Sequence, residues 1–364
     1  MNNYLIFCGL SFFSLFTLSF SETRVCGKIG IPTDWTAENS PYIITNDIII
    51  PKGSRLKIAA GTIIRFTPPQ PCSQPLLPQD DWADSQFTSI KVYGNFYING
   101  TDEKPILFES HPQSKITGWD GIRFYERGHA TTRITYAIFK GAHSAIRAFH
   151  SFFDVTHSLF ENNQTGIFLT DYSNLTIVNN HFIHNKSSGI YIFGGSPQIY
   201  NNIFAFNQGY GIWSDNRLGT KIKYNGFWRN SEGHCHKCPV SILKFPKKDK
   251  DEKTQPTDKH HNLIGNPVFW GSKTFKILAK RDVSIDTKHQ LTKNQALTKK
   301  VQSMEEELRS FQKRKSFVVQ GKGAYRLSRY SAFINKGDPS KIYLDRDGTP
   351  NDLGIHGGTV KKVD

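Results

Sequence analysis

Residues 176–214 read TIVNNHFIHNKSSGIYIFGGSPQIYNNIFAFNQGYGIWS, in which one pattern of apolar, asparagine and glycine residues occurs twice, 22 residues apart. The pattern extends in both directions. Its phenylalanine column, at spacings of 21, 22, 22 and 23, comprises Phe139, Phe160, Phe182, Phe204 and Phe227. Five residues before each phenylalanine stands a β-branched residue: Ile134, Val155, Ile177, Ile199 and Ile222. A repeat of this length predicts one structural unit per repeat, stacked into a solenoid.

Further columns indicate which kind of solenoid this is. A third apolar column comprises Ile146, Ile167, Ile190 and Ile212, and asparagine forms two more: Asn163, Asn185, Asn207 and Asn230, and Asn180, Asn202 and Asn225. The units have almost none of the leucine that a leucine-rich repeat requires. Short β-branched and aromatic runs between Asn and Gly predict brief strands joined by tight turns. We therefore predict a β-solenoid with Ile, Val and Phe inside, and with Asn at the corners, where stacked amides can hydrogen-bond along a ladder.

Earlier segments follow the same design at looser spacing, over residues 46–66, 89–108 and 118–124. Here the sequence resembles right-handed parallel β-helix proteins of the pectin-lyase-like type, specifically secreted bacterial repeat proteins. Such proteins open with an IPxGxxLxIxxGTxIxF coil, continue with WxGIxF and close with a Gly-Asp-Pro and Asp-x-Asp-Gly tail. The resemblance covers most of residues 42–279 and 328–358. It implies an all-β chain forming one single-stranded right-handed parallel β-helix. It indicates very little about the reaction or ligand, because one fold can carry many functions.

Two segments interrupt the repeats. Residues 244–261 have the composition of a solvated loop. In residues 280–318, apolar residues spaced 4, 3, 4 and 3 apart from Leu297 to Phe311 predict an amphipathic helix of about five turns. We expect this helix to pack against the solenoid or its open end; a partner-binding role is the alternative. The predicted organisation is a signal peptide at 1–21, a β-helix at 22–279 capped by residues 26–65, a charged, partly helical insertion at 280–327 and a tail segment at 328–364.

The N-terminus and the composition bear on location. Residues 1–21 carry no charge and are followed at Glu22 by a polar start, which predicts a secretory signal cleaved near Ser21; a retained N-terminal anchor is the alternative. At 37% apolar residues, the 364-residue chain is neither collagen-like nor wholly disordered. The net charge of +15 comes largely from residues 244–315, with 18 basic and 9 acidic side chains. We expect a secreted, periplasmic or surface-exposed monomer that binds no nucleic acid and has no membrane span after cleavage.

Four cysteines remain after signal cleavage, and an even number in an exported protein suggests disulfides. We favour the pairs Cys26–Cys72 and Cys235–Cys238, because each lies on one side of the long repeat region. The HCHKC run at 234–238, with His260 and His261, leaves a zinc or copper site or free thiols as alternatives.

Catalytic candidates follow the Gly-Ile column. His150, Asp171 and Asp215 stand at nearly equivalent places in their coils, and Arg217 and Lys221 lie just beyond. The resemblance implies that lyases of this fold use carboxylates to bind Ca²⁺ and an Arg or Lys as the base. The Asn-Thr-Asp, Asp-Asp, Gly-His-Gly and Arg-Ile-Lys motifs of polygalacturonase-type hydrolases are not present as an intact set, which argues against that subclass. The alternative role for the candidates is that of exposed corner residues.

Two other groups of residues are candidate ligand contacts. Asp345, Asp347 and Asp352 have the composition of a hard-cation site, possible for calcium, although the alternative is a turn that ends the solenoid. Tyr191 and Trp213 each follow a predicted inward Ile and are therefore expected to face outward, where they could stack on sugar rings.

These observations give three functional expectations. The first is a non-catalytic β-helix protein that binds a glycan or another envelope component. The second is a polysaccharide lyase or related enzyme acting on an acidic polymer, which a basic surface would suit. The third is an adhesion protein in which the solenoid is a stalk and the charged segment makes the contact.

Overall fold

The structure is a computed structural model and describes residues 22–73, 86–115, 117–125, 132–215, 219–238, 260–265, 267, 331, 333, 335–340 and 352–354. The predicted signal peptide and the charged segment at 280–327 lie outside the described residues. Apart from one 3-10 turn, η1 (Ala37–Asn39), every regular element described is a β-strand. No helix in the described part of the chain is long and apolar enough to cross a membrane.

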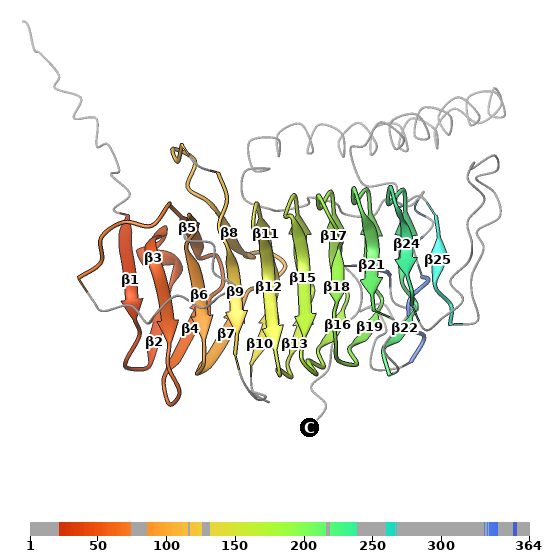
Figure 1. Cartoon of the computed structure of the whole chain (residues 1–364), viewed down its shortest axis with the longest axis horizontal. Helices are drawn as coiled ribbons and strands as arrows, with labels where there is room; N and C mark the ends of the chain where they lie inside the picture. Colours follow the sequence, from red (N-terminus) through yellow and green to blue (C-terminus); the bar gives the residue numbers. More distant parts are fainter. Residues whose placement is uncertain are drawn as a thin grey trace, which may run out of the picture.

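The strands stack into three parallel ladders that run along the molecule (Figure 1). The first ladder comprises β5 (Ile63–Phe66), β8 (Ile106–Ser110), β11 (Ala137–Lys140), β14 (Leu159–Glu161), β17 (His181–Ile183), β20 (Ile203–Ala205), β23 (Gly226–Trp228) and β25 (Leu263–Ile264). The second comprises β6 (Ser89–Val92), β9 (Gly121–Phe124), β12 (Ser144–Phe149), β15 (Thr165–Thr170), β18 (Ile190–Ile192), β21 (Tyr210–Ser214) and β24 (Gly233–His236). The third comprises β2 (Thr33–Trp35), β4 (Arg55–Ala59), β7 (Asn95–Asn99), β10 (Arg133–Thr135), β13 (Asp154–Thr156), β16 (Thr176–Val178), β19 (Gln198–Tyr200) and β22 (Lys221–Lys223).

Two N-terminal strands join the first and second ladders. β3 (Tyr42–Ile50) pairs with β5 through its first residues and with β6 through its last. β1 (Thr23–Lys28) pairs in parallel with both halves of β3. The region predicted to cap the solenoid therefore contributes strands to its ladders. The predicted all-β parallel β-helix is confirmed, with one turn of chain contributing one strand to each ladder.

The predicted apolar columns form the interior. Each phenylalanine from Phe139 to Phe227 in the repeat column is fully buried, and successive ring centroids are 4.9, 4.7, 4.8 and 5.1 Å apart. The two isoleucine and valine columns are buried as well. Parallel strands about 4.8 Å apart place identical side chains over one another, so a column in the sequence becomes a continuous core.

Asparagine ladders hold the corners together. In the first, Asn163, Asn185 and Asn207 each donate from Nδ2 to the Oδ1 of the next asparagine at 3.1, 2.9 and 2.7 Å, ending at Asn230. In the second, Asn180, Asn202 and Asn225 do the same at 3.0 Å each, ending at Asn262. All of these side chains are buried. The predicted hydrogen bonding of stacked amides is therefore present over four coils in each ladder.

Both favoured disulfides are present. Cys26 on β1 is bonded to Cys72, with Cα atoms 6.1 Å apart, and Cys235 is bonded to Cys238, with Cα atoms 5.9 Å apart. The first links the opening strand to the segment after β5. The second lies at the end of β24.

The described residues of the tail lie against the outer face of the first ladder. Phe333 and Leu353 are fully buried in an apolar cluster with Ile203 and Leu263. The backbone N–H of Gly354 donates to the carbonyl of Asn201 at 2.7 Å, and that of Asp338 donates to the Asn201 Oδ1 at 2.9 Å. The C-terminal segment therefore returns over coils that precede it in the sequence.

Candidate functional site

One column of side chains runs along the outer face of the second ladder. Strand pairing aligns seven residues, one from each strand between β6 and β24, which we call the outer column: Lys91, Arg123, Arg147, Phe168, Tyr191, Trp213 and His236. The residue before each of Arg147, Phe168, Tyr191 and Trp213 is a buried Ile of the interior. Because successive side chains of a strand point to opposite faces, the outer column faces away from the core.

The second half of the outer column is a continuous aromatic stack. The rings of Phe168 and Tyr191 lie 5.0 Å apart, those of Tyr191 and Trp213 4.1 Å apart, and those of Trp213 and His236 5.5 Å apart, with interplanar angles of 5°, 6° and 15°. The four side chains are partly exposed. Burial raises the pKa of Tyr191, and the nearby carboxylate of Asp215 raises it further.

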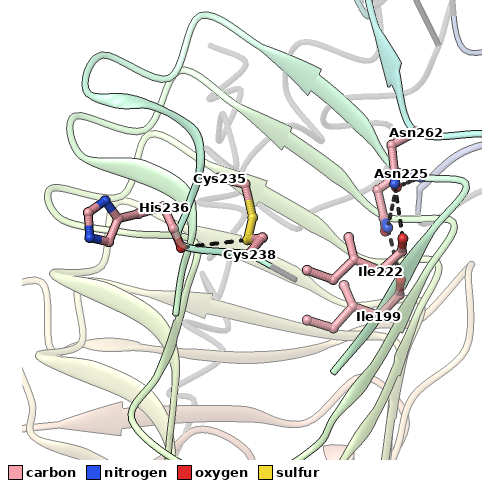
Figure 2. Close-up of a disulfide and its surroundings, with 7 residues drawn as sticks. All are labelled: Ile199, Ile222, Asn225, Cys235, His236, Cys238 and Asn262. Atoms are coloured by element: carbon pink, nitrogen blue, oxygen red, sulfur yellow. Dashed lines mark hydrogen bonds between the residues drawn. A yellow bond between two sulfur atoms is a disulfide. The ribbon is translucent and has the colours of Figure 1, made fainter. Parts of the chain in front are cut away.

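Figure 2 shows the end of this stack at β24. The imidazole of His236 lies on the outer side of the strand, whereas the Cys235–Cys238 disulfide lies on the side of Ile199 and Ile222. Both cysteines pack against the apolar core. The disulfide therefore belongs to the inner face of the coil, and His236 to the outer column.

The first half of the outer column is cationic, and its first two charges are neutralised. Lys91 Nζ lies 3.1 Å from Asp47 Oδ2, and the Arg123 guanidinium forms an ion pair with Asp120. Lys91, Arg123 and Asp120 are buried. Burial raises the pKa of Asp120 to about 6, against the opposing effect of Arg123 and Arg147.

Arg147 lies where the cationic half meets the aromatic half. Its guanidinium carbon is 4.9 Å from the centroid of the Phe168 ring, a cation–π contact. Its side chain is partly exposed, unlike that of Arg123. Arg147 is therefore the arginine of the outer column that an incoming ligand reaches.

A second outward column flanks the first, two residues further along each strand. This flanking column comprises Tyr93, Tyr125, Phe149, Thr170, Phe193 and Asp215. The rings of Tyr93 and Tyr125 lie 4.9 Å apart, and those of Tyr125 and Phe149 lie 5.4 Å apart. The outer face of the second ladder thus has two adjacent rows rich in aromatic rings.

The structure brings together only some of the sequence-predicted site residues. Tyr191 and Trp213 are stacked neighbours in the outer column, and their ligand-binding role stays a prediction. Sequence reasoning missed Arg147, Phe168 and His236. The signal was present, because each of Arg147, Phe168, Tyr191 and Trp213 follows an Ile of one column.

The catalytic candidates are spread over two ladders. Asp171 aligns with His150 and Gly194, whereas Asp215 aligns with Phe193, one position earlier in its coil. Thr170 Oγ1 donates to the Asp171 carboxylate at 2.7 Å. Lys221 lies on β22 of the third ladder, and Arg217 lies outside the described residues. A catalytic role for these four residues stays a prediction.

Of the three predicted calcium ligands, the structure describes only Asp352. Asp352 Oδ1 accepts a hydrogen bond from the backbone N–H of Asn335 at 2.8 Å, whereas Asp345 and Asp347 lie outside the described residues. Within the described part of the chain, no group of three or more His, Cys, Asp or Glu side chains is arranged to hold a metal ion.

Burial lowers the pKa of His234 to about 4. The disulfide removes the two thiolates that a zinc or copper site at residues 234–238 would need.

The comparison with known families agrees with the geometry. Residues 95–240 match the family described as a right-handed beta helix region. The chain contains a right-handed β-helix. This β-helix region includes the outer column from Arg123 to His236. No curated protein and no solved structure matches the chain.

Proposed function

We propose that the β-helix binds a glycan along the outer column. The observation that carries this proposal is the partly exposed aromatic stack from Phe168 to His236, bordered by Arg147. The apolar face of a sugar ring packs against an aromatic face, and an arginine binds carboxylate or hydroxyl oxygens. A chain lying across successive coils meets one aromatic ring about every 4.8 Å.

The outer aromatic rings are not needed to build the solenoid. The core already has its own phenylalanine stack, and the asparagine ladders satisfy the corners. The outer face of the third ladder folds with polar residues at aligned positions: Asp154, Thr176, Gln198 and Lys221. Stacked ring pairs also occur at other corners of the coils, as in Tyr136–His157 and His184–Phe206, but the outer column has four stacked rings in succession, which supports a binding role.

We infer that the protein is exported to the periplasm, the cell surface or the medium. The two disulfides support this inference, because disulfides persist in oxidising compartments. The uncharged segment at residues 1–21 has the composition of a secretory signal.

The test is affinity electrophoresis of the purified protein in gels containing polyuronates or neutral glycans, with and without Ca²⁺. We expect at least one glycan to retard the wild type. Trp213→Ala should weaken that retardation by about tenfold, since one aromatic stacking contact contributes about 1.4 kcal/mol. Tyr200→Ala is the matched control, because Tyr200 is a partly exposed aromatic on β19 of the third ladder. Equal retardation of wild type and Trp213→Ala would contradict the proposed site.

A polysaccharide lyase or related enzyme acting on an acidic polymer is the second candidate. It is favoured by the carboxyl of Asp120, whose pKa of about 6 lies near neutral beside Arg123 and Arg147. Against it, the side chain of Asp120 is only 3% exposed, so substrate does not reach it in this conformation. The same glycan panel tests it through the absorbance of unsaturated ends and the count of reducing ends. New ends would establish catalysis and direct mutagenesis first to Asp120, and then to the sequence-predicted candidates Asp171, Asp215, Arg217 and Lys221.

A further inference from the structure

Exposed apolar side chains gather at one corner of the solenoid. Among the described residues, four large apolar side chains are exposed: Ile31, Phe152, Tyr172 and Phe193, at 73, 43, 73 and 55%. Three of them follow the second ladder in successive coils, at the ends of β12, β15 and β18. We call Phe152, Tyr172 and Phe193 the corner patch. Burying such side chains on a partner is favourable, so their recurrence at this corner in three successive coils points to a contact surface.

The corner patch is continuous with the proposed glycan site. Phe193 belongs to the flanking column and follows Tyr191 of the outer column by two residues on the same strand face. Two residues of a strand span about 6.6 Å. Tyr172 lies at the same corner in the preceding coil, where its ring is 5.8 Å from that of His150. A ligand seated on Tyr191 therefore lies one sugar ring away from the patch.

The backbone at this corner has the left-handed conformation that recurs at the turns of the solenoid. Asp171 and Tyr172 have φ values of 47° and 62°, and His150, opposite Asp171 in the preceding coil, has a φ of 45°. The buried His157 and Asn179 at another corner have φ values of 50° and 57°. This turn geometry leaves Tyr172 73% exposed.

The charge of the corner differs from that of the outer column. Residues 149–153, 170–174 and 193–196 contain no Lys or Arg, and the carboxylates of Asp171 and Asp215 border the patch. Carboxylates accept hydrogen bonds from sugar hydroxyls and repel acidic groups. By contrast, Arg147 in the outer column attracts acidic groups. The patch therefore fits an uncharged sugar better than a uronate.

We propose that the glycan is branched, and that the corner patch binds an uncharged side-chain sugar while the glycan backbone lies on the outer column. This inference rests on the proposed function. It assigns the exposed aromatics Tyr172 and Phe193 and the carboxylate of Asp171 to recognition of the branch.

The test compares the affinity of the protein for matched branched and unbranched glycans by calorimetry. The pairs are galactomannan and unbranched mannan, xyloglucan and unbranched cello-oligosaccharides, and branched pectin and unbranched homogalacturonan. We expect the wild type to bind the branched member of one pair about tenfold more tightly. Tyr172→Ala and Phe193→Ala should each reduce that preference by about threefold or more, and leave the affinity for the unbranched member unchanged.

Two controls separate this inference from the proposed function. Ile31→Ala removes an equally exposed apolar side chain from the N-terminal region and should leave both affinities unchanged. Trp213→Ala should weaken the binding of both members of the pair. Equal affinity of the wild type for both members, or an equal loss for both in Tyr172→Ala, would overturn the branched-ligand inference alone. Failure of the wild type to bind any member would overturn the glycan-binding proposal as well.

Discussion

Asn185 lies in the solenoid wall with all the hydrogen-bonding capacity of its side-chain amide used. Its Nδ2 donates to Asn207 Oδ1 at 2.9 Å and to the Phe160 carbonyl at 3.1 Å. Its Oδ1 accepts from the backbone N–H and the Nδ2 of Asn163, both at 3.1 Å. One amide thus ties together three coils.

Removing this amide leaves buried polar groups without partners. We expect Asn185→Ala to lower the free energy of unfolding by about 2–4 kcal/mol, because each buried unsatisfied group costs about 1–3 kcal/mol. Urea denaturation measures the effect. Asn174→Ala is the control: Asn174 is exposed, its Oδ1 accepts from the Ser196 N–H, and we expect a loss below about 1 kcal/mol. Similar losses in both variants would show that the ladder contributes no special stability.

The raised pKa of Asp120 makes the free energy of unfolding depend on pH. Its folded pKa of about 6 lies above the ordinary value of 3.8, so between these values the folded state binds the proton more tightly than the unfolded state. Its contribution to stability is therefore full below about pH 4 and is lost as the pH rises through 6. His234, whose pKa is lowered to about 4 by burial, acts in the opposite sense: its contribution is present above 6.5 and lost as the pH falls through 4.

The Asp120→Asn variant isolates the carboxyl from the histidine. We expect the difference in unfolding free energy between wild type and Asp120→Asn to change by about 2 kcal/mol between pH 4 and pH 7, with the wild type relatively less stable at pH 7. Urea denaturation at several pH values gives this difference, and His234 cancels because both proteins contain it. A difference independent of pH would contradict the raised pKa.

Individual side chains were partly predictable from the sequence. Tyr191 and Trp213 could be placed on the outside because each follows an inward Ile, and successive side chains of a strand point to opposite faces. Arg147 and Phe168 obey the same rule, but an arginine and a phenylalanine do not look like one column until the register is known. The nearly equivalent places of Asp171 and Asp215 differ by one register position, since coils of 21 to 23 residues place their extra residues in turns that periodicity does not locate.

At the scale of elements, the sequence repeat predicted the strands and their pairing, but it did not predict which segment covers the outer side of the first ladder. The first ladder presents Ile138, Leu159 and Ile203 on its outer side, and they are buried there. Part of the cover is Phe333, whose ring lies so close to Gly226 that a Cβ there would meet it at 2.7 Å. Contacts between segments a hundred residues apart leave no periodic trace in a sequence, so this docking was not predictable.

The docked tail gives a prediction for this element. Phe333→Ala should lower stability by about 3–5 kcal/mol, because it leaves a large cavity against the first ladder. Limited proteolysis should then cleave the segment at 331–354 faster than in the wild type. Phe152→Ala, which alters an exposed ring of similar size, should leave the cleavage rate unchanged. An unchanged rate in Phe333→Ala would contradict the packing of the tail on the first ladder.

At the scale of the whole molecule, the three ladders differ in what they show to their surroundings. The outer face of the first is covered in part by the tail, that of the third has a row of polar residues from Asp154 to Lys221, and that of the second has the outer and flanking columns. The interior columns were predictable because stacking demands identical residues. The ligand was not, because the same scaffold accepts many outer residues without a change of fold.

The most direct test of the glycan-binding claim uses the fluorescence of Trp213. Of the six tryptophans of the chain, Trp35, Trp119 and Trp228 are buried at 4, 0 and 7% exposure and should not respond to a surface ligand, whereas Trp213 lies in the outer column. Trp82 and Trp270 lie outside the described residues and are replaced by Phe in the protein used for this titration. Titration with a glycan that retards the protein in gels should shift the tryptophan emission saturably. Trp213→Phe should keep the ring stack and the binding, but lose the shift. Binding by the wild type without a change in emission, or a shift that persists in Trp213→Phe, would contradict a glycan seated on the outer column.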